Sequence, residues 1–249
     1  MEVGALAGAV LAGRYVVEPL LAALFPSDCP LCNALLARPT GGPLCQQCLN
    51  ALPRHSATVC ACGHPLPAGA LPPCGRCRRQ LNPLPEGASL GPYEGALRSA
   101  VLALKFGGRR RLAVQLARVL WSVPGVRALL AADAILVPVP LHARRLRRRG
   151  FNQSELIARE LARLSRQRLC AGALTRRRDT SAQTGLSAAQ RRANVTGAFA
   201  VQRASCVRGV TVVLVDDVYT TGATARSCAQ ALRRAGVKGV RLVTVARTA

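Results

Sequence analysis

The sequence predicts an α/β protein, with a mainly parallel sheet flanked by helices and a small cysteine-rich module at its N-terminal end. From about Gly91 onward, apolar strand-like segments alternate with helical patterns, the order that builds parallel sheets. Eight of the 11 cysteines lie in pairs between Cys29 and Cys77, in a stretch rich in proline and glycine. We therefore expect three parts, over residues 1–25, 26–85 and 86–249.

Residues 1–25 are expected to form a packing helix. The apolar run from Val3 to Gly13 is interrupted by Arg14 and Glu18. It falls short of the roughly 20 residues that span a bilayer. It also lacks the basic start and the cleavage pattern of a signal peptide. We expect a cytoplasmic protein without stable membrane insertion.

The charge of the chain is strongly positive, with a net value of +24. Such a balance suggests a polyanionic partner, either nucleic acid or phosphorylated metabolites. Nearly all the basic residues are arginine, with lysine only at Lys105 and Lys238. That bias can equally reflect genomic base composition, so the charge alone does not choose a partner.

The paired cysteines predict metal sites. A CxxC turn directs two thiolates at one tetrahedral centre, and two such turns complete a Cys₄ zinc site. Four pairs therefore supply two structural zinc ions in a double zinc ribbon. The predicted ligands are Cys29, Cys32, Cys45, Cys48, Cys60, Cys62, Cys74 and Cys77.

Two alternatives to this zinc arrangement remain open from the sequence. The pair Cys60-x-Cys62 is one residue shorter than a usual knuckle, and His64 could replace one of its thiolates. An iron–sulfur cluster also accepts four cysteines. Cys170, Cys206 and Cys228 are scattered singly, outside the module.

The first half of the remaining chain predicts two helices, a strand and a capped helix. Apolar periodicity predicts helices over 94–104 and 109–121. A short buried strand follows over 134–139. Asn152, with Glu155 three residues later, predicts the capped start of the next helix.

The second half begins with a polar, arginine-rich stretch over 172–197, which is typical of a functional or mobile segment. A strand over 210–215, a helix over 225–235 and a strand over 240–245 complete the α/β pattern.

The most informative motif follows the strand over 210–215. Asp216 and Asp217 stand at its end, and a Thr-Thr-Gly-Ala-Thr loop leads into the next helix. Ligands bind at the carboxyl ends of strands in open α/β sheets. Carboxylates accept hydrogen bonds from vicinal ribose hydroxyls and can help to hold Mg²⁺. A glycine-containing loop at a helix N-terminus suits a phosphate dianion.

A Walker B strand also ends in two acids, but it requires a GxxxxGK[ST] partner, and neither lysine follows a glycine. An ATPase is therefore disfavoured. A purely structural origin is also disfavoured, because two uncompensated acids are costly at the end of a buried strand.

The segment resembles the phosphoribosyl-pyrophosphate signature of type I phosphoribosyltransferases. This resemblance implies that Asp216 and Asp217 hold the ribose hydroxyls. It also implies a 5′-phosphate site made by Thr220, Thr221, Gly222, Ala223 and Thr224.

Other segments resemble the ComF family, amidophosphoribosyltransferase-like competence proteins with an N-terminal double zinc ribbon and a type I phosphoribosyltransferase domain. They are Val137–Leu141, Arg149–Gln153, Leu104–Phe106 and the pattern from Thr180 to Phe199. The resemblance covers nearly the whole chain from about Phe25. It implies phosphoribosyl pyrophosphate with Mg²⁺ as ligand, and a role in DNA uptake or utilisation.

The arginine-rich loop after the strand over 134–139 is expected at the same edge of the sheet as the acid pair. Guanidinium groups there can neutralise pyrophosphate. The candidates are Arg144, Arg145 and, from an earlier helix, Lys105. The resemblance places a mobile flap at residues 176–194.

Three functions remain open. A transferase would displace pyrophosphate at ribose C1 by positioning and charge stabilisation, without a dedicated nucleophile. A non-catalytic sensor would bind phosphoribosyl pyrophosphate without turnover. An adaptor would bind single-stranded DNA or a DNA-uptake helicase. The sequence identifies no acceptor-binding residue.

Overall fold

The computed structural model describes residues 27–36, 42–55, 58–79, 85–131, 133–178 and 197–248. The chain divides into two compact units, Met1–Leu52 and Pro53–Ala249. The helix expected over residues 1–25 lies outside the described residues. In the first unit, the short helix α2 (Gln46–Asn50) follows Cys45. The second unit contains both the sheet and the cysteines from Cys60 to Cys77.

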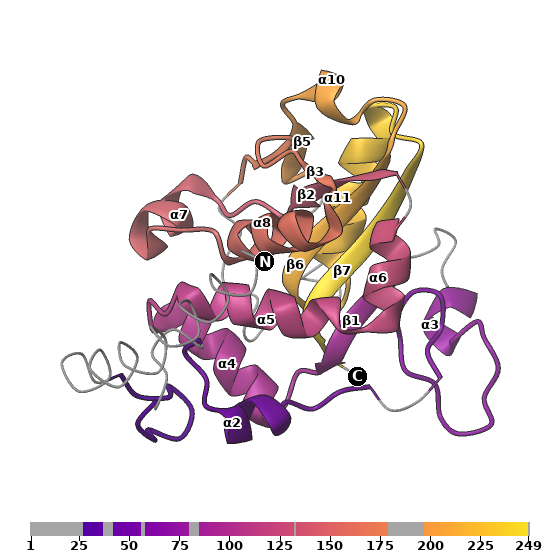
Figure 1. Ribbon diagram of the computed structural model, residues 1–249. Helices are drawn as coiled ribbons and strands as arrows, with labels where there is room; N and C mark the ends of the chain where they lie inside the picture. Colours follow the sequence, from indigo (N-terminus) through magenta and orange to yellow (C-terminus); the bar gives the residue numbers. More distant parts are fainter. Residues whose placement is uncertain are drawn as a thin grey trace, which may run out of the picture. The chain divides into compact units, whose positions relative to one another are not determined.

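The second unit is built on a five-stranded parallel sheet, which confirms the predicted fold class (Figure 1). Every neighbouring pair of strands in this sheet runs parallel. In spatial order the strands are β1 (Glu86–Pro92), β7 (Gly239–Arg247), β6 (Thr211–Tyr219), β2 (Ala134–Pro138) and β3 (Arg168–Leu169).

Helices cover both faces of this sheet (Figure 1). On one face, α5 packs against α8 and β1, α8 packs against β2 and β6, and α6 lies beside β1. The other face holds α11 and a two-stranded antiparallel hairpin, β4–β5. The bounds are α4 (Gly95–Phe106), α5 (Arg111–Trp121), α6 (Pro124–Ala131), α8 (Gln153–Ser165), α11 (Ala223–Arg234), β4 (Leu174–Arg176) and β5 (Phe199–Val201).

The strands differ from the sequence expectation at two places. β6 continues to Tyr219, so Asp216 and Asp217 lie within the strand rather than after it. Backbone pairing with β7 extends it, since Asp216 is in register with Thr244. β1 was not predicted, because its sequence EGASLGP is poor in β-branched residues and contains two glycines and a proline. Its pairing with β7 maintains it.

The chain leaves the carboxyl ends of β2 and β6 in opposite directions. From β2 it passes through α8 to β3 on one side, and from β6 it passes through α11 to β7 on the other. This divergence is the topological switch point of an open α/β sheet, where ligands bind. The loop after β2 contains the short helix α7 (Ala143–Arg149).

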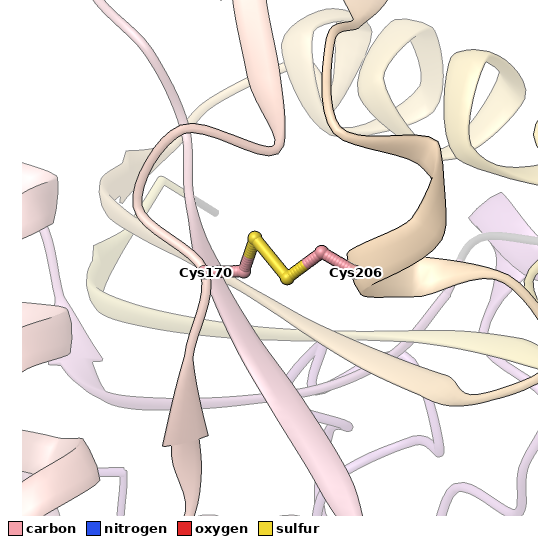
Figure 2. Close-up of a disulfide and its surroundings, with 2 residues drawn as sticks. All are labelled: Cys170 and Cys206. Atoms are coloured by element: carbon pink, nitrogen blue, oxygen red, sulfur yellow. A yellow bond between two sulfur atoms is a disulfide. The ribbon is translucent and has the colours of Figure 1, made fainter.

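A disulfide joins Cys170, which follows β3, to Cys206 in the short helix α10 (Ala204–Val207) (Figure 2). Sequence spacing did not suggest this pair, because the two residues are 36 positions apart. The bond lies at the base of the β4–β5 hairpin, whose connecting segment contains the expected flap. Most of that flap, residues 179–194, lies outside the described residues. Among the described residues, no helix is long and apolar enough to cross a membrane.

Candidate functional site

A cleft of about 380 Å³ lies at the switch point, between the loops that follow β2 and β6. Val139, Pro140 and Leu141 line it from the first loop. The residues predicted from sequence that line it are Lys105, Arg145, Asp216, Asp217, Thr220, Gly222 and Thr224. Thr221, Ala223 and Arg144 are not in the lining.

The acid pair is the most polar part of the cleft. Asp217 is buried, and its Oδ1 lies 3.1 Å from the Lys105 ammonium nitrogen. Its Oδ2 is buried without a hydrogen-bond donor among the described residues. Asp216 Oδ1 accepts hydrogen bonds from Ser154 Oγ at 3.0 Å and from the Asp217 backbone N–H at 2.9 Å. A buried carboxylate oxygen without a donor is costly, so the site suits a ligand that brings hydroxyl groups or a cation.

The charges at this site are strongly coupled. Burial and the negative charge of Asp217 raise the pKa of Asp216 to about 7, although Lys105 acts against the rise. Burial tends to lower the pKa of Lys105, but the charge of Asp217 outweighs it and holds that pKa above its ordinary value. Lys105 therefore stays positive and neutralises Asp217, while Asp216 titrates near neutrality.

The loop after β6 turns sharply at Gly222, the N-cap of α11, which has a φ of 74°. A Cβ at this position would stand 2.2 Å from the Tyr219 Oη, so both the backbone conformation and the space require glycine. The Thr221 hydroxyl accepts from the Ala223 backbone N–H at 3.4 Å, and the Arg226 guanidinium donates to the Thr221 carbonyl at 2.8 Å. These contacts brace a loop at the N-terminus of a 12-residue helix, which suits an anion.

The opposite wall of the cleft is formed by α7 and the end of α4. His142 caps α7, with its Nδ1 accepting from the Arg144 backbone N–H at 3.3 Å. Arg149 lies over the ring of Phe106, with its guanidinium carbon 5.3 Å from the ring centroid. Phe106 lines the cleft and remains 70% exposed.

Sequence reasoning assigned no role to Phe106, Gln153 or Ser154, all of which line the cleft. The signal available for Phe106 was an aromatic residue at the end of a helix in a chain with only 3% aromatics. Its neighbour Lys105, predicted to contact a phosphate, forms an ion pair with Asp217.

The eight predicted metal ligands gather into two groups of four. One group is Cys29, Cys32, Cys45 and Cys48, and the other is Cys60, Cys62, Cys74 and Cys77. Within each group, all four sulfur atoms lie within 4.8 Å of one another. The Sγ–Sγ distances are 3.6 Å for Cys32–Cys45, 3.8 Å for Cys60–Cys77 and 3.7 Å for Cys62–Cys74. A tetrahedral site with Zn–S bonds of about 2.3 Å has an edge of about 3.8 Å, so both groups fit structural zinc.

The shortened pair Cys60-x-Cys62 is accommodated by a tight turn. The Gly63 backbone N–H donates to the Cys60 carbonyl at 2.7 Å, and Gly63 has a φ of 77°. The Cys74 backbone N–H points to Cys60 Sγ at 3.4 Å. Because four cysteine sulfurs complete this group, His64 is not needed as a ligand.

The cysteine module and the sheet domain both match known families. Residues 20–78 match the double zinc ribbon domain, and residues 146–249 match the phosphoribosyl transferase domain.

Several relatives match most of the chain. The DNA utilization protein YhgH of Escherichia coli (strain K12) is 37% identical over 228 residues, covering 90% of this chain and 98% of that protein. Competence protein F of Haemophilus influenzae is 32% identical over 179 residues, covering 70% and 78%. Competence protein ComFC of Bacillus subtilis is 26% identical over 200 residues, covering 78% and 79%.

The sulfur geometry predicts two zinc ions per chain. Replacing Cys62→Ser or Cys32→Ser should each remove one equivalent, because each change breaks one Cys₄ group. Elemental analysis of the purified protein measures the count. A single zinc in the unmodified protein would contradict the prediction, and iron in place of zinc would contradict the identity of the metal.

Proposed function

Since the chain belongs to the ComF family, we propose that its cleft binds phosphoribosyl pyrophosphate with Mg²⁺ and that the protein acts in DNA uptake or utilisation. The observation that carries the ligand proposal is the unpaired, buried Oδ2 of Asp217, beside Asp216 and next to the loop at Gly222. The names of the relatives, which refer to DNA utilization and competence, support the second part.

Each part of this ligand has a matching group in the cleft. The 5′-phosphate would bind at Thr220, Gly222 and Thr224, with Thr221 and Ala223 shaping the loop from behind. The ribose hydroxyls would donate to Asp216 and Asp217, whose carboxylates can each accept two hydrogen bonds.

The pyrophosphate would lie toward Arg145 and Arg149, both of which line the cleft. Arg144 is outside that lining, and Lys105 is held by Asp217, so Lys105 would act mainly by neutralising the acid pair. Mg²⁺ would supply positive charge to the pyrophosphate, and the carboxylates offer the oxygen ligands that it prefers.

As a transferase, the protein would hold ribose C1 open to an acceptor. A bond from the acceptor to C1 would form as the C1–oxygen bond to pyrophosphate breaks, and the electron pair would leave with pyrophosphate. The arginines would stabilise that departing charge. Release of pyrophosphate with any acceptor separates this function from that of a sensor, which binds without turnover.

Calorimetric titration of Mg²⁺–phosphoribosyl pyrophosphate into the zinc-loaded protein tests the ligand. We expect saturable binding that weakens about 10- to 100-fold in Asp217→Asn, because a charge-assisted hydrogen bond to the ribose is lost. Asp133→Asn, at an exposed acid just before β2 and so at the opposite edge of the sheet, is the matched control and should bind as the unmodified protein does. Absence of binding by the folded, unmodified protein would overturn the proposal.

The raised pKa of Asp216 predicts a pH dependence. As pH falls through about 7, Asp216 takes up a proton and ceases to accept two hydrogen bonds from the ribose. Affinity for the ligand should therefore fall about fourfold between pH 8 and pH 6.5, following the ionised fraction of a group with this pKa. Asp216→Asn should bind more weakly and show a flatter profile. An equally steep profile in that variant would assign the titration to another group.

A second candidate function is direct contact with single-stranded DNA beside the cleft. Phe106 is exposed, and Arg149 stacks on its ring, which together present a flat surface to an unstacked base. The exposed arginines of α7, Arg147 and Arg148, would contact phosphates.

Phe106→Ala should weaken binding of an oligothymidylate about 5- to 100-fold, because one base-stacking contact is lost. The dependence of affinity on salt should stay unchanged, since that slope counts phosphate contacts. Replacing Arg147 and Arg148 with glutamine should instead flatten the slope. Leu71→Ala, at another exposed apolar residue, is the control. Unaltered affinity in Phe106→Ala would remove Phe106 from the DNA surface.

A further inference from the structure

Arg247, the last residue of β7, is a buried cation without a carboxylate partner among the described residues. Its side chain is 3% exposed. Its Nη2 donates to the Cys62 carbonyl at 2.7 Å, whereas its Nε and Nη1 have no hydrogen-bond partner in the described structure. Burying an arginine costs several kcal/mol unless an opposite charge compensates it, on the order given for isolated buried ions. The surroundings of Arg247 must therefore supply negative charge.

The second group of four cysteines can supply that charge, because the Cys62 carbonyl accepts a hydrogen bond from Arg247. A zinc ion bound by four thiolates carries a net charge of about −2, from one divalent cation and four anions. The hydrogen bond from the Arg247 guanidinium to the Cys62 carbonyl places the two groups side by side. Zinc at Cys60, Cys62, Cys74 and Cys77 would convert Arg247 from an uncompensated cation into the counter-ion of the metal site.

The Arg247 guanidinium also contacts Tyr219, the residue just before the candidate phosphate loop (Thr220–Thr224). Arg247 and Tyr219 are register partners on the neighbouring strands β7 and β6. The guanidinium carbon lies 4.0 Å from the centroid of the Tyr219 ring, a cation–π contact between two buried side chains. The Tyr219 hydroxyl in turn occupies the space beside Gly222, where a Cβ would stand 2.2 Å from it.

These contacts form one continuous path from metal to ligand site. The Cys62 carbonyl accepts a hydrogen bond from Arg247, and the Arg247 guanidinium stacks on the Tyr219 ring. The Tyr219 hydroxyl in turn limits the positions that Gly222 can take. We propose that Arg247 is a positioning residue that couples zinc loading of the second Cys₄ group to the conformation of the phosphate loop. The consequence for affinity rests on the proposed function, whereas the consequence for loop order does not.

Hydrogen–deuterium exchange of the backbone amides over residues 219–226 tests the coupling without any ligand. In the full-length protein, Arg247→Met and Cys77→Ser should each speed this exchange about tenfold, because each breaks the same path. The double variant should be no faster than either single variant, the signature of residues that act through one contact chain. Arg241→Met, at an arginine on the same strand that pairs with Glu86, is the control and should leave the exchange unchanged.

Calorimetry with Mg²⁺–phosphoribosyl pyrophosphate gives a second readout. Affinity should fall about tenfold in Arg247→Met, and saturating ligand should tighten zinc at the second site by the same factor that zinc tightens the ligand. In Arg247→Met both factors should fall close to one, because the coupling is lost.

Each outcome of these measurements decides a different claim. The coupling would be overturned if the effects of Arg247→Met and Cys77→Ser on the exchange rate were additive. It would also be overturned if neither variant changed the exchange rate of the loop, even if the ligand binds. Coupled exchange without ligand binding would retain the positioning role of Arg247 and refute the proposed function instead.

Discussion

The parallel pairing of β6 with β2 on one side and β7 on the other is the constraint on which the rest of the structure depends. Pairing with β2 ends at Val215, whereas pairing with β7 keeps β6 extended through Asp216 and Asp217, so that two acids stand at the switch point rather than in a loose turn. The backbone hydrogen bonds of the sheet maintain this position whatever the side chains are. The cost of crowding two carboxylates is offset by Lys105 and by hydrogen bonds to Asp216. Burial, together with the charge of Asp217, raises the pKa of Asp216 toward neutrality.

Charge compensation organises this strongly basic chain at two buried places. At the cleft, a lysine neutralises one acid and leaves an unpaired oxygen for a ligand. At the second cysteine group, a buried arginine has no acid beside it among the described residues, and the thiolates of a zinc-loaded site would provide the negative charge. Tyr219 stands between the two, since it contacts Arg247 and borders the cleft. Within the second unit, the second cysteine group and the sheet therefore meet through the contacts of Arg247.

Sequence patterns predicted the elements whose signals are local. The Asn152 cap is confirmed, since its side chain accepts from the Ser154 backbone N–H. The apolar periodicity over 94–104 and 109–121 corresponds to α4 and α5. β1 was not predicted, because its composition disfavours a strand and its extended conformation depends on pairing with β7. The strand ending was placed too early at Val215 because acids usually mark a strand end, whereas here they face a cleft.

By itself, the sequence determined the α/β class, the eight metal ligands and the acid pair followed by a threonine–glycine loop. Each of these depends on residue types at short, fixed spacings. Only the tertiary structure decided that Lys105 pairs with Asp217, that Cys170 meets Cys206 and that Arg247 lies between Cys62 and Tyr219. These contacts join residues 36 to 185 positions apart or lie across neighbouring strands. Their partners are selected by strand order and register, which local periodicity does not specify.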